Sequence, residues 1–83
     1  NLPEAKQLKA KADIQELAKN VSYEELEPLF STAAKKVGTR IATMITLGVL
    51  LKNGLKRNAA IEAFIQKALE DTDALLVAEA SAI

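Results

Sequence analysis

Cysteine and histidine are absent from this 83-residue sequence. Without cysteine the chain has no disulfides, thiol nucleophiles or thiolate zinc sites, and without histidine it has no imidazole acid–base chemistry. No Gly-rich phosphate loop is present either. We therefore predict a protein that is not an enzyme and that holds no metal and no cofactor.

Proline, glycine and aromatic residues are also scarce, with two prolines, three glycines and 4% aromatics against 49% hydrophobic residues. Alanine and leucine supply most of the apolar fraction, and both favour helices. No segment alternates apolar and polar residues as a half-buried strand does. The prediction is an all-α fold, a compact bundle of four to five short helices. The length allows one domain, residues 1–83.

The two ends and the apolar stretches bear on targeting. The first residue is Asn1, so we expect a processed product or a fragment, with fraying of the first eight or so and the last four or so residues. The start lacks the basic-then-apolar layout of a secretory signal. The longest apolar stretch, residues 41–51, is shorter than the roughly 20 residues of a membrane span. We expect a soluble, cytoplasmic protein with no membrane partner.

The first half of the chain offers two helices and a turn. An apolar stripe predicts a helix from the N-terminal residues to about Val21. Ser22 and Glu25 form a capping box, yet Pro28 would interrupt a helix that begins there. We therefore predict a short turn at residues 22–26 and a main helix that begins near Glu27 or Pro28 and ends at Gly38, in the left-handed conformation.

The next segment, residues 39–52, is apolar almost all round. Thr39 is its expected cap and Asn53-Gly54 its end, and its polar strip is Thr39, Thr43 and Thr46. Such a helix is buried from most sides, as a central helix or as the wall of an interface. The candidate interface residues are Ile41, Ile45 and Val49.

Two more helices are predicted after Gly54. Asn58 caps the first, which carries Ile61, Phe64, Ile65, Ala68 and Leu69 on one face. Residues 70–73 end that helix and supply caps for a last helical segment over residues 74–83.

The net charge is zero, with eleven Lys and Arg against eleven Asp and Glu, but the charges are unevenly distributed. Residues 1–27 carry −2 and residues 62–83 carry −4, whereas residues 28–61 contain six cations and no acid. The cations are Lys35, Lys36, Arg40, Lys52, Lys56 and Arg57. Most of them fall near predicted helix C-termini, where cations complement the helix dipole. Arg40 falls in a first turn instead, so we expect it to pair with an acid from another segment or to face a ligand or partner.

The same six cations form the candidate contact set for a nucleic acid or an acidic partner. On a straight helix, Arg40 and Lys52 would lie about 18 Å apart, a separation that could reach two strands of a duplex.

Residues 34–38, Ala-Lys-Lys-Val-Gly, resemble the Ala-x-x-x-Gly of helix-turn-helix proteins. The positions that would face the DNA groove are Ile41, Ala42, Ile45, Thr46 and Val49. Four of these five are apolar and cannot hydrogen-bond to base edges, so we do not predict sequence-specific reading of DNA.

The leading hypothesis is a non-catalytic helical module for protein–protein interaction or self-association, with a homodimer favoured. It rests on the small core, on the apolar segment 39–52 and on oppositely charged blocks that could pair between chains. Nucleic-acid binding through the basic segment 35–57 is the alternative. A small-molecule partner is not expected.

Overall fold

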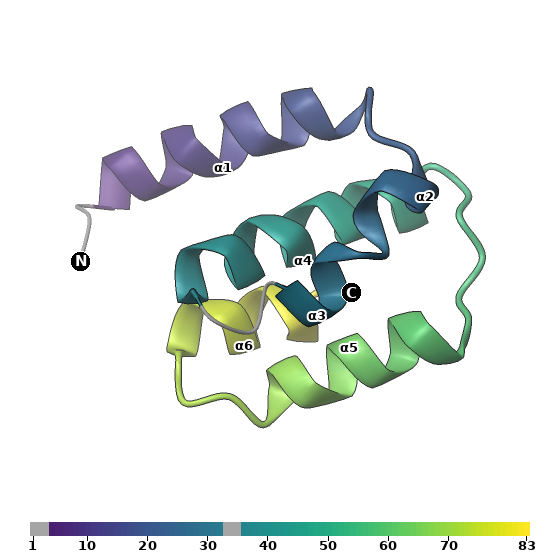
Figure 1. Ribbon diagram of the computed structural model, residues 1–83. Coiled ribbons are helices and arrows are strands. Elements are labelled where there is room, and N and C mark those ends of the chain that lie inside the picture. The colour runs from purple at the N-terminus through teal and green to yellow at the C-terminus, as the bar shows by residue number, and fades with distance from the viewer. Residues whose placement is uncertain (1–3, 33–35) are drawn as a thin grey trace.

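A computed structural model of the protein describes residues 4–32 and 36–83. Within these residues all regular structure is helical, which confirms the all-α prediction (Figure 1). The segments are α1 (Glu4–Ala18), α2 (Tyr23–Leu26), α3 (Leu29–Thr32), α4 (Val37–Lys52), α5 (Ala59–Leu69) and α6 (Ala74–Ser81). Two of them, α2 and α3, are single turns of four residues.

Helix α4 lies at the centre of the bundle, as its apolar sequence predicts. It packs against α1, α2, α3 and α6, and α5 completes the bundle by packing on α6 (Figure 1). Met44 and Leu47 of α4 are completely buried, together with Ile61 of α5. Among the described helices, α4 included, none combines the length and hydropathy that crossing a membrane would require.

Local side-chain caps set most helix boundaries where the sequence predicts them. Ser22 Oγ accepts a hydrogen bond from the Glu25 N–H, and the Glu25 carboxylate accepts one from the Ser22 N–H, so the capping box is confirmed. Asn58 caps α5 and Asp73 caps α6 in the same manner. Helix α4 ends at Lys52 with Asn53 as its C-cap, and Gly54 follows with φ +109°.

The predicted main helix from residue 27 or 28 to Gly38 is wrong. Helix α3 spans only Leu29–Thr32, and residues 33–35 lie outside the described part. Gly38 belongs to α4, and Gly54 is the only described glycine with positive φ. Glycine adopts both left-handed and helical conformations, so its presence alone does not end a helix. Here α4 extends back across Gly38.

Thr39 is not the cap of α4, because the helix begins two residues earlier. Lys36 occupies the N-cap position, and its side chain makes no capping hydrogen bond. The predicted polar strip is turned inward in part: Thr43 is buried, and its hydroxyl donates to the Thr39 carbonyl at 2.7 Å. This bond satisfies the hydroxyl within the apolar core.

The chain ends bear on the predicted fraying. The first three residues lie outside the described part. At the other end α6 continues to Ser81, and Ala80 is buried. Fraying stays a prediction.

Candidate interaction site

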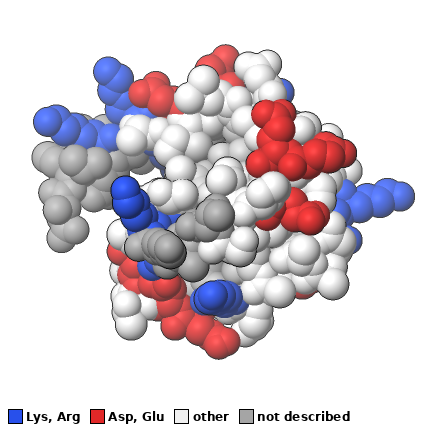
Figure 2. All heavy atoms as spheres, in the orientation of Figure 1, with Lys and Arg blue, Asp and Glu red and all other residues white. Residues whose placement is uncertain are grey.

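The predicted basic segment is divided between the two ends of α4. Lys36 and Arg40 lie at its start, whereas Lys52, Lys56 and Arg57 lie at or beyond its end. Sixteen residues of helix place Lys36 and Lys52 about 24 Å apart. On the face in view, Figure 2 shows the Lys and Arg atoms of the described residues at separate places and not in one patch. Lys35 lies outside the described residues.

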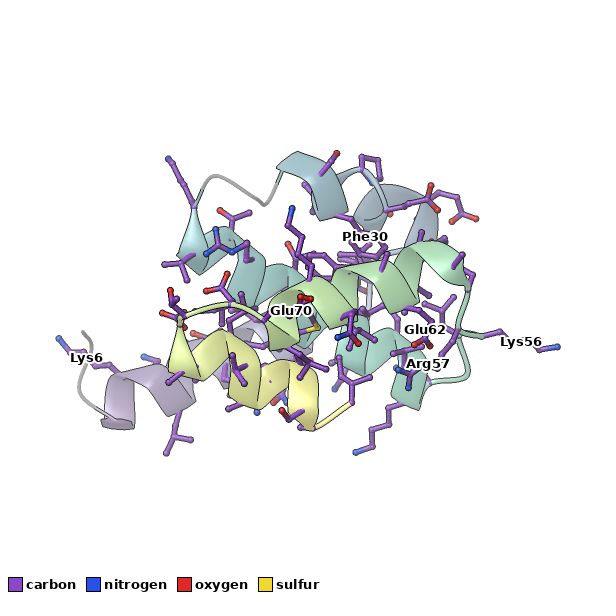
Figure 3. The ribbon with its side chains drawn as sticks, turned by 90° about the horizontal axis from the view of Figure 1, so that it is seen from below. Lys6, Phe30, Lys56, Arg57, Glu62 and Glu70 are labelled. Atoms are coloured by element: carbon purple, nitrogen blue, oxygen red, sulfur yellow. The ribbon has the colours of Figure 1, made fainter. Side chains whose placement is uncertain are left out.

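Of the five cations of this set that the structure describes, Arg40 and Arg57 are paired within the chain. Arg40 Nη2 lies 3.1 Å from Asp71 Oδ2, and both side chains are about four-fifths buried. This pair joins the start of α4 to the turn between α5 and α6, as expected for a cation in a first turn. Arg57 pairs with Glu62 (Figure 3). In the described part of the chain, Lys36, Lys52 and Lys56 are exposed and form no ion pair.

The acids near residue 71 are engaged in local structure. Asp71 also accepts a hydrogen bond from the Asp73 N–H at 2.8 Å, and Asp73 caps α6. No group of three carboxylates in the described segments is arranged to hold a metal ion.

The candidate interface residues on α4 face the inside of the folded chain to different degrees. Ile45 is 6% exposed, and Ile41 and Val49 are half-buried. A cavity of about 160 Å³ beside Ile45 and Val49 is lined on its other side by Lys11 and Gln15 of α1. Helix α1 therefore covers much of this face.

All three aromatic side chains of the protein lie in one row. The Tyr23 and Phe30 ring centroids are 6.2 Å apart, and Phe30 stacks on Phe64 at 4.6 Å. The row connects α2 and α3 with α5 and brings the two single-turn helices against the bundle. Figure 3 shows Phe30 between α3 and α5. Aromatic pairs with this geometry add to the stabilisation from buried area.

Hydrogen bonds fix one end of the aromatic row. The Asn58 amide donates to the Tyr23 hydroxyl at 2.9 Å while its carbonyl oxygen caps α5. The Tyr23 hydroxyl in turn bonds to the Glu27 carboxylate, and this bond, together with burial and the charge of Glu27, raises the pKa of Tyr23. The raising effects outweigh the opposing effect of Asn58. Glu27 is thereby placed near the N-terminal end of α5.

A groove runs between α3 and α5 beside this row, and we call it the α3–α5 groove. Its wider part, about 330 Å³, is lined by Glu27, Phe30, Ser31, Ala60, Ala63, Phe64 and Lys67. A smaller hollow of about 140 Å³ adjoins it, because Phe30, Phe64 and Lys67 line both. Carbon atoms of alanine and phenylalanine thus form most of the groove.

The two ends of the wider part of the groove differ in charge. Glu27 lies at the end near Asn58, and Lys67 lies seven residues along α5 from Ala60, or about 10 Å. Figure 2 shows a largely uncharged surface between acidic atoms gathered over α2 and basic atoms over α5, and further acidic atoms lie beside the basic ones. Sequence reasoning missed this groove, because it depends on how the single-turn helix α3 crosses α5. The groove follows from the stacking of Phe30 on Phe64, and the sequence does not show that these two residues meet.

No protein family model, curated protein or solved structure matches this chain.

Proposed function

We propose that this chain is a non-catalytic self-association module, in which two copies pack their α3–α5 grooves together about a twofold axis. The observation that carries the proposal is the polarity of the groove. Its wider part is lined mainly by alanine and phenylalanine, with the acid Glu27 at one end and the cation Lys67 at the other, where it adjoins the hollow beside Arg40 and Asp71.

A twofold axis makes this surface complementary to itself. An axis perpendicular to the groove superposes the two grooves in opposite directions, so Glu27 of each copy lies opposite Lys67 of the other. Each exposed ion pair contributes little, about 0–1 kcal/mol, but like charges at the same positions would oppose docking. The charges therefore select the antiparallel arrangement.

The apolar lining supplies the attraction between copies. Ala60 and Ala63 are exposed, and Phe30 is half-buried. Apolar surface removed from water contributes about 25 cal/mol per Å². A specific interface buries about 600 Å² per partner at the small end of the range, roughly a tenth of the 5578 Å² surface of this chain. The proposal accordingly implies a reversible dimer of modest affinity.

Sedimentation equilibrium over a range of roughly 5–500 μM, which spans modest affinities, tests the proposal. The wild-type chain should dimerise, and Lys67→Glu should remain monomeric because the introduced carboxylate lies opposite Glu27 of the other copy. Lys56→Glu is the matched control, since it changes the net charge equally at a side chain that points away from the molecule (Figure 3). A monomeric wild type, or equal effects of the two reversals, would contradict the proposal.

Nucleic-acid binding through Lys35, Lys36, Arg40, Lys52, Lys56 and Arg57 has less support. Arg40 and Arg57 already have carboxylate partners, and the exposed lysines stand at opposite ends of α4. A gel-shift titration at about 50 mM salt, where phosphate contacts are strong, decides this alternative.

A further inference from the structure

Helix α1 is the least buried of the long helices. Of its described side chains only Ala18 is buried, while Lys11 and Ile14 are half-buried. Leu8 and Leu17 are 62% and 68% exposed. They are nine residues apart, which places them on opposite sides of the helix. Helix α1 thus docks on the bundle with a small part of its surface.

Helix α1 docks on a surface formed by α4 and α6, which we call the seat of α1. The helix packs along α4, and Lys11 Nζ lies 2.9 Å from the Glu79 carboxylate of α6, which is 13% exposed. A solvent-open cleft of about 160 Å³ beside Lys11 and Gln15 borders the contact.

A short connection joins α1 to the rest of the chain. Residues 19–22 separate α1 from α2 and form turn hydrogen bonds back to the last turn of α1, such as Asn20 N–H to the Leu17 carbonyl. Extending this turn breaks few bonds and releases α1 as a unit, in the way that small, poorly buried elements open ahead of global unfolding.

We infer that α1 is an exchangeable arm, and that its seat on α4 and α6 accepts α1 of a second copy. The occupant is given by the structure itself, because the seat already fits α1, and every contact made within one chain can form again between two. In particular, Lys11 of one copy would pair with Glu79 of the other. This interface lies on a different face from the α3–α5 groove and does not depend on it.

Docking within one chain prevails at low concentration. A tethered arm has an effective concentration in the millimolar range, so exchange between wild-type copies is suppressed at micromolar protein. Exchange of α1 can be detected when a mutation weakens the docking of α1 within its own chain but not its docking on the other chain. Opposite charge reversals at Lys11 and Glu79 meet this condition.

Two variants test the inference, both made in a Lys67→Glu background that disables the groove. One carries Lys11→Glu and the other Glu79→Lys, so each chain alone has like charges at the seat. In an equimolar mixture, opposite charges meet only when the arms are exchanged between the two variants. We expect each variant alone to be monomeric, with faster hydrogen exchange in α1, and the mixture to form a heterodimer with α1 protection restored.

Lys9→Glu replaces Lys11→Glu in the control mixture, because Lys9 is exposed on α1 and gives the same net charge. The inference is overturned if the test mixture stays monomeric, or if the control mixture dimerises equally well. Because both chains carry Lys67→Glu, a failure here leaves the proposed groove dimer standing. Failure of the groove dimer likewise leaves this experiment readable.

Discussion

Gly38 and Gly54 stand at opposite ends of α4 and have opposite backbone requirements. Gly38 is helical with nothing within 4 Å of an added Cβ, whereas Gly54 has φ +109°. Gly38→Ala should therefore raise the free energy of unfolding by about 0.5–1 kcal/mol, because alanine loses less backbone entropy in a helix. Gly54→Ala should lower it by about 1–2 kcal/mol, since L-residues are strained there. Urea denaturation measures both, and a loss of stability in Gly38→Ala would contradict a helical Gly38.

Tyr23 makes stability depend on pH in the alkaline range. Its hydrogen bond to Glu27 favours the protonated hydroxyl and raises the pKa of Tyr23 in the folded chain. The unfolded tyrosine loses its proton near pH 10, below the folded pKa. The contribution of this hydroxyl is therefore complete below about pH 10 and is lost as pH rises through the folded pKa.

Comparison with Tyr23→Phe isolates this contribution from that of the lysines, which titrate in the same range. The difference in unfolding free energy between the wild type and Tyr23→Phe should become smaller above about pH 10. A difference that stays constant from about pH 8 to about pH 11.5 would contradict the assigned hydrogen bond.

Among the elements, α4 begins without a side-chain cap and with a cation where the helix dipole disfavours one. Lys36→Asp would supply an acceptor for the free N–H groups of the first turn and remove the cation, so we expect a gain of about 1 kcal/mol. Lys52→Asp makes the same charge change in the last turn, where it should cost about 0.3–1 kcal/mol. Thermal unfolding of the two variants should give Tm shifts of opposite sign. Shifts of the same sign would show that α4 does not begin at Val37.

Element boundaries that depend on neighbouring residues are predictable from this sequence, and those that depend on packing are not. Ser22, Asn58 and Asp73 act as caps because each needs only a backbone N–H three residues away. Gly38 was misassigned because either conformation suits glycine, and packing of α4 on its neighbours selects the helical one. Helix electrostatics predicts that Arg40 either pairs with an acid or faces a partner, and Asp71 is identifiable as the acid only once α5 and α6 are in place.

The candidate interaction site depends even more on packing than the helix boundaries do. The apolar character of α4 suggested an interface at Ile41, Ile45 and Val49, yet Ile45 is buried in the folded chain. The α3–α5 groove combines residues from both halves of the sequence, Glu27 and Phe30 with Phe64 and Lys67. No local pattern relates these residues, because their proximity arises from the stacking of Phe30 on Phe64.

Over the whole molecule, the zero net charge conceals a specific arrangement of paired charges. Along the chain the charges form blocks, but folding pairs Lys11 with Glu79, Arg40 with Asp71 and Arg57 with Glu62. These pairs join the basic middle segment and the first helix to the acidic C-terminal segment. Among the described residues, the wider part of the α3–α5 groove keeps the acid Glu27 at one end and the cation Lys67 at the other, which is the basis of the proposed dimer.

The most direct test of this proposal is sedimentation equilibrium on an equimolar mixture of Glu27→Lys and Lys67→Glu. Each variant alone places like charges opposite each other across the twofold axis, so each should be monomeric at concentrations where the wild type is a dimer. In the mixture both charge pairs are opposite in sign, and a heterodimer should form with an affinity close to that of the wild type. A mixture that sediments as monomers while the wild type dimerises would contradict the antiparallel groove dimer.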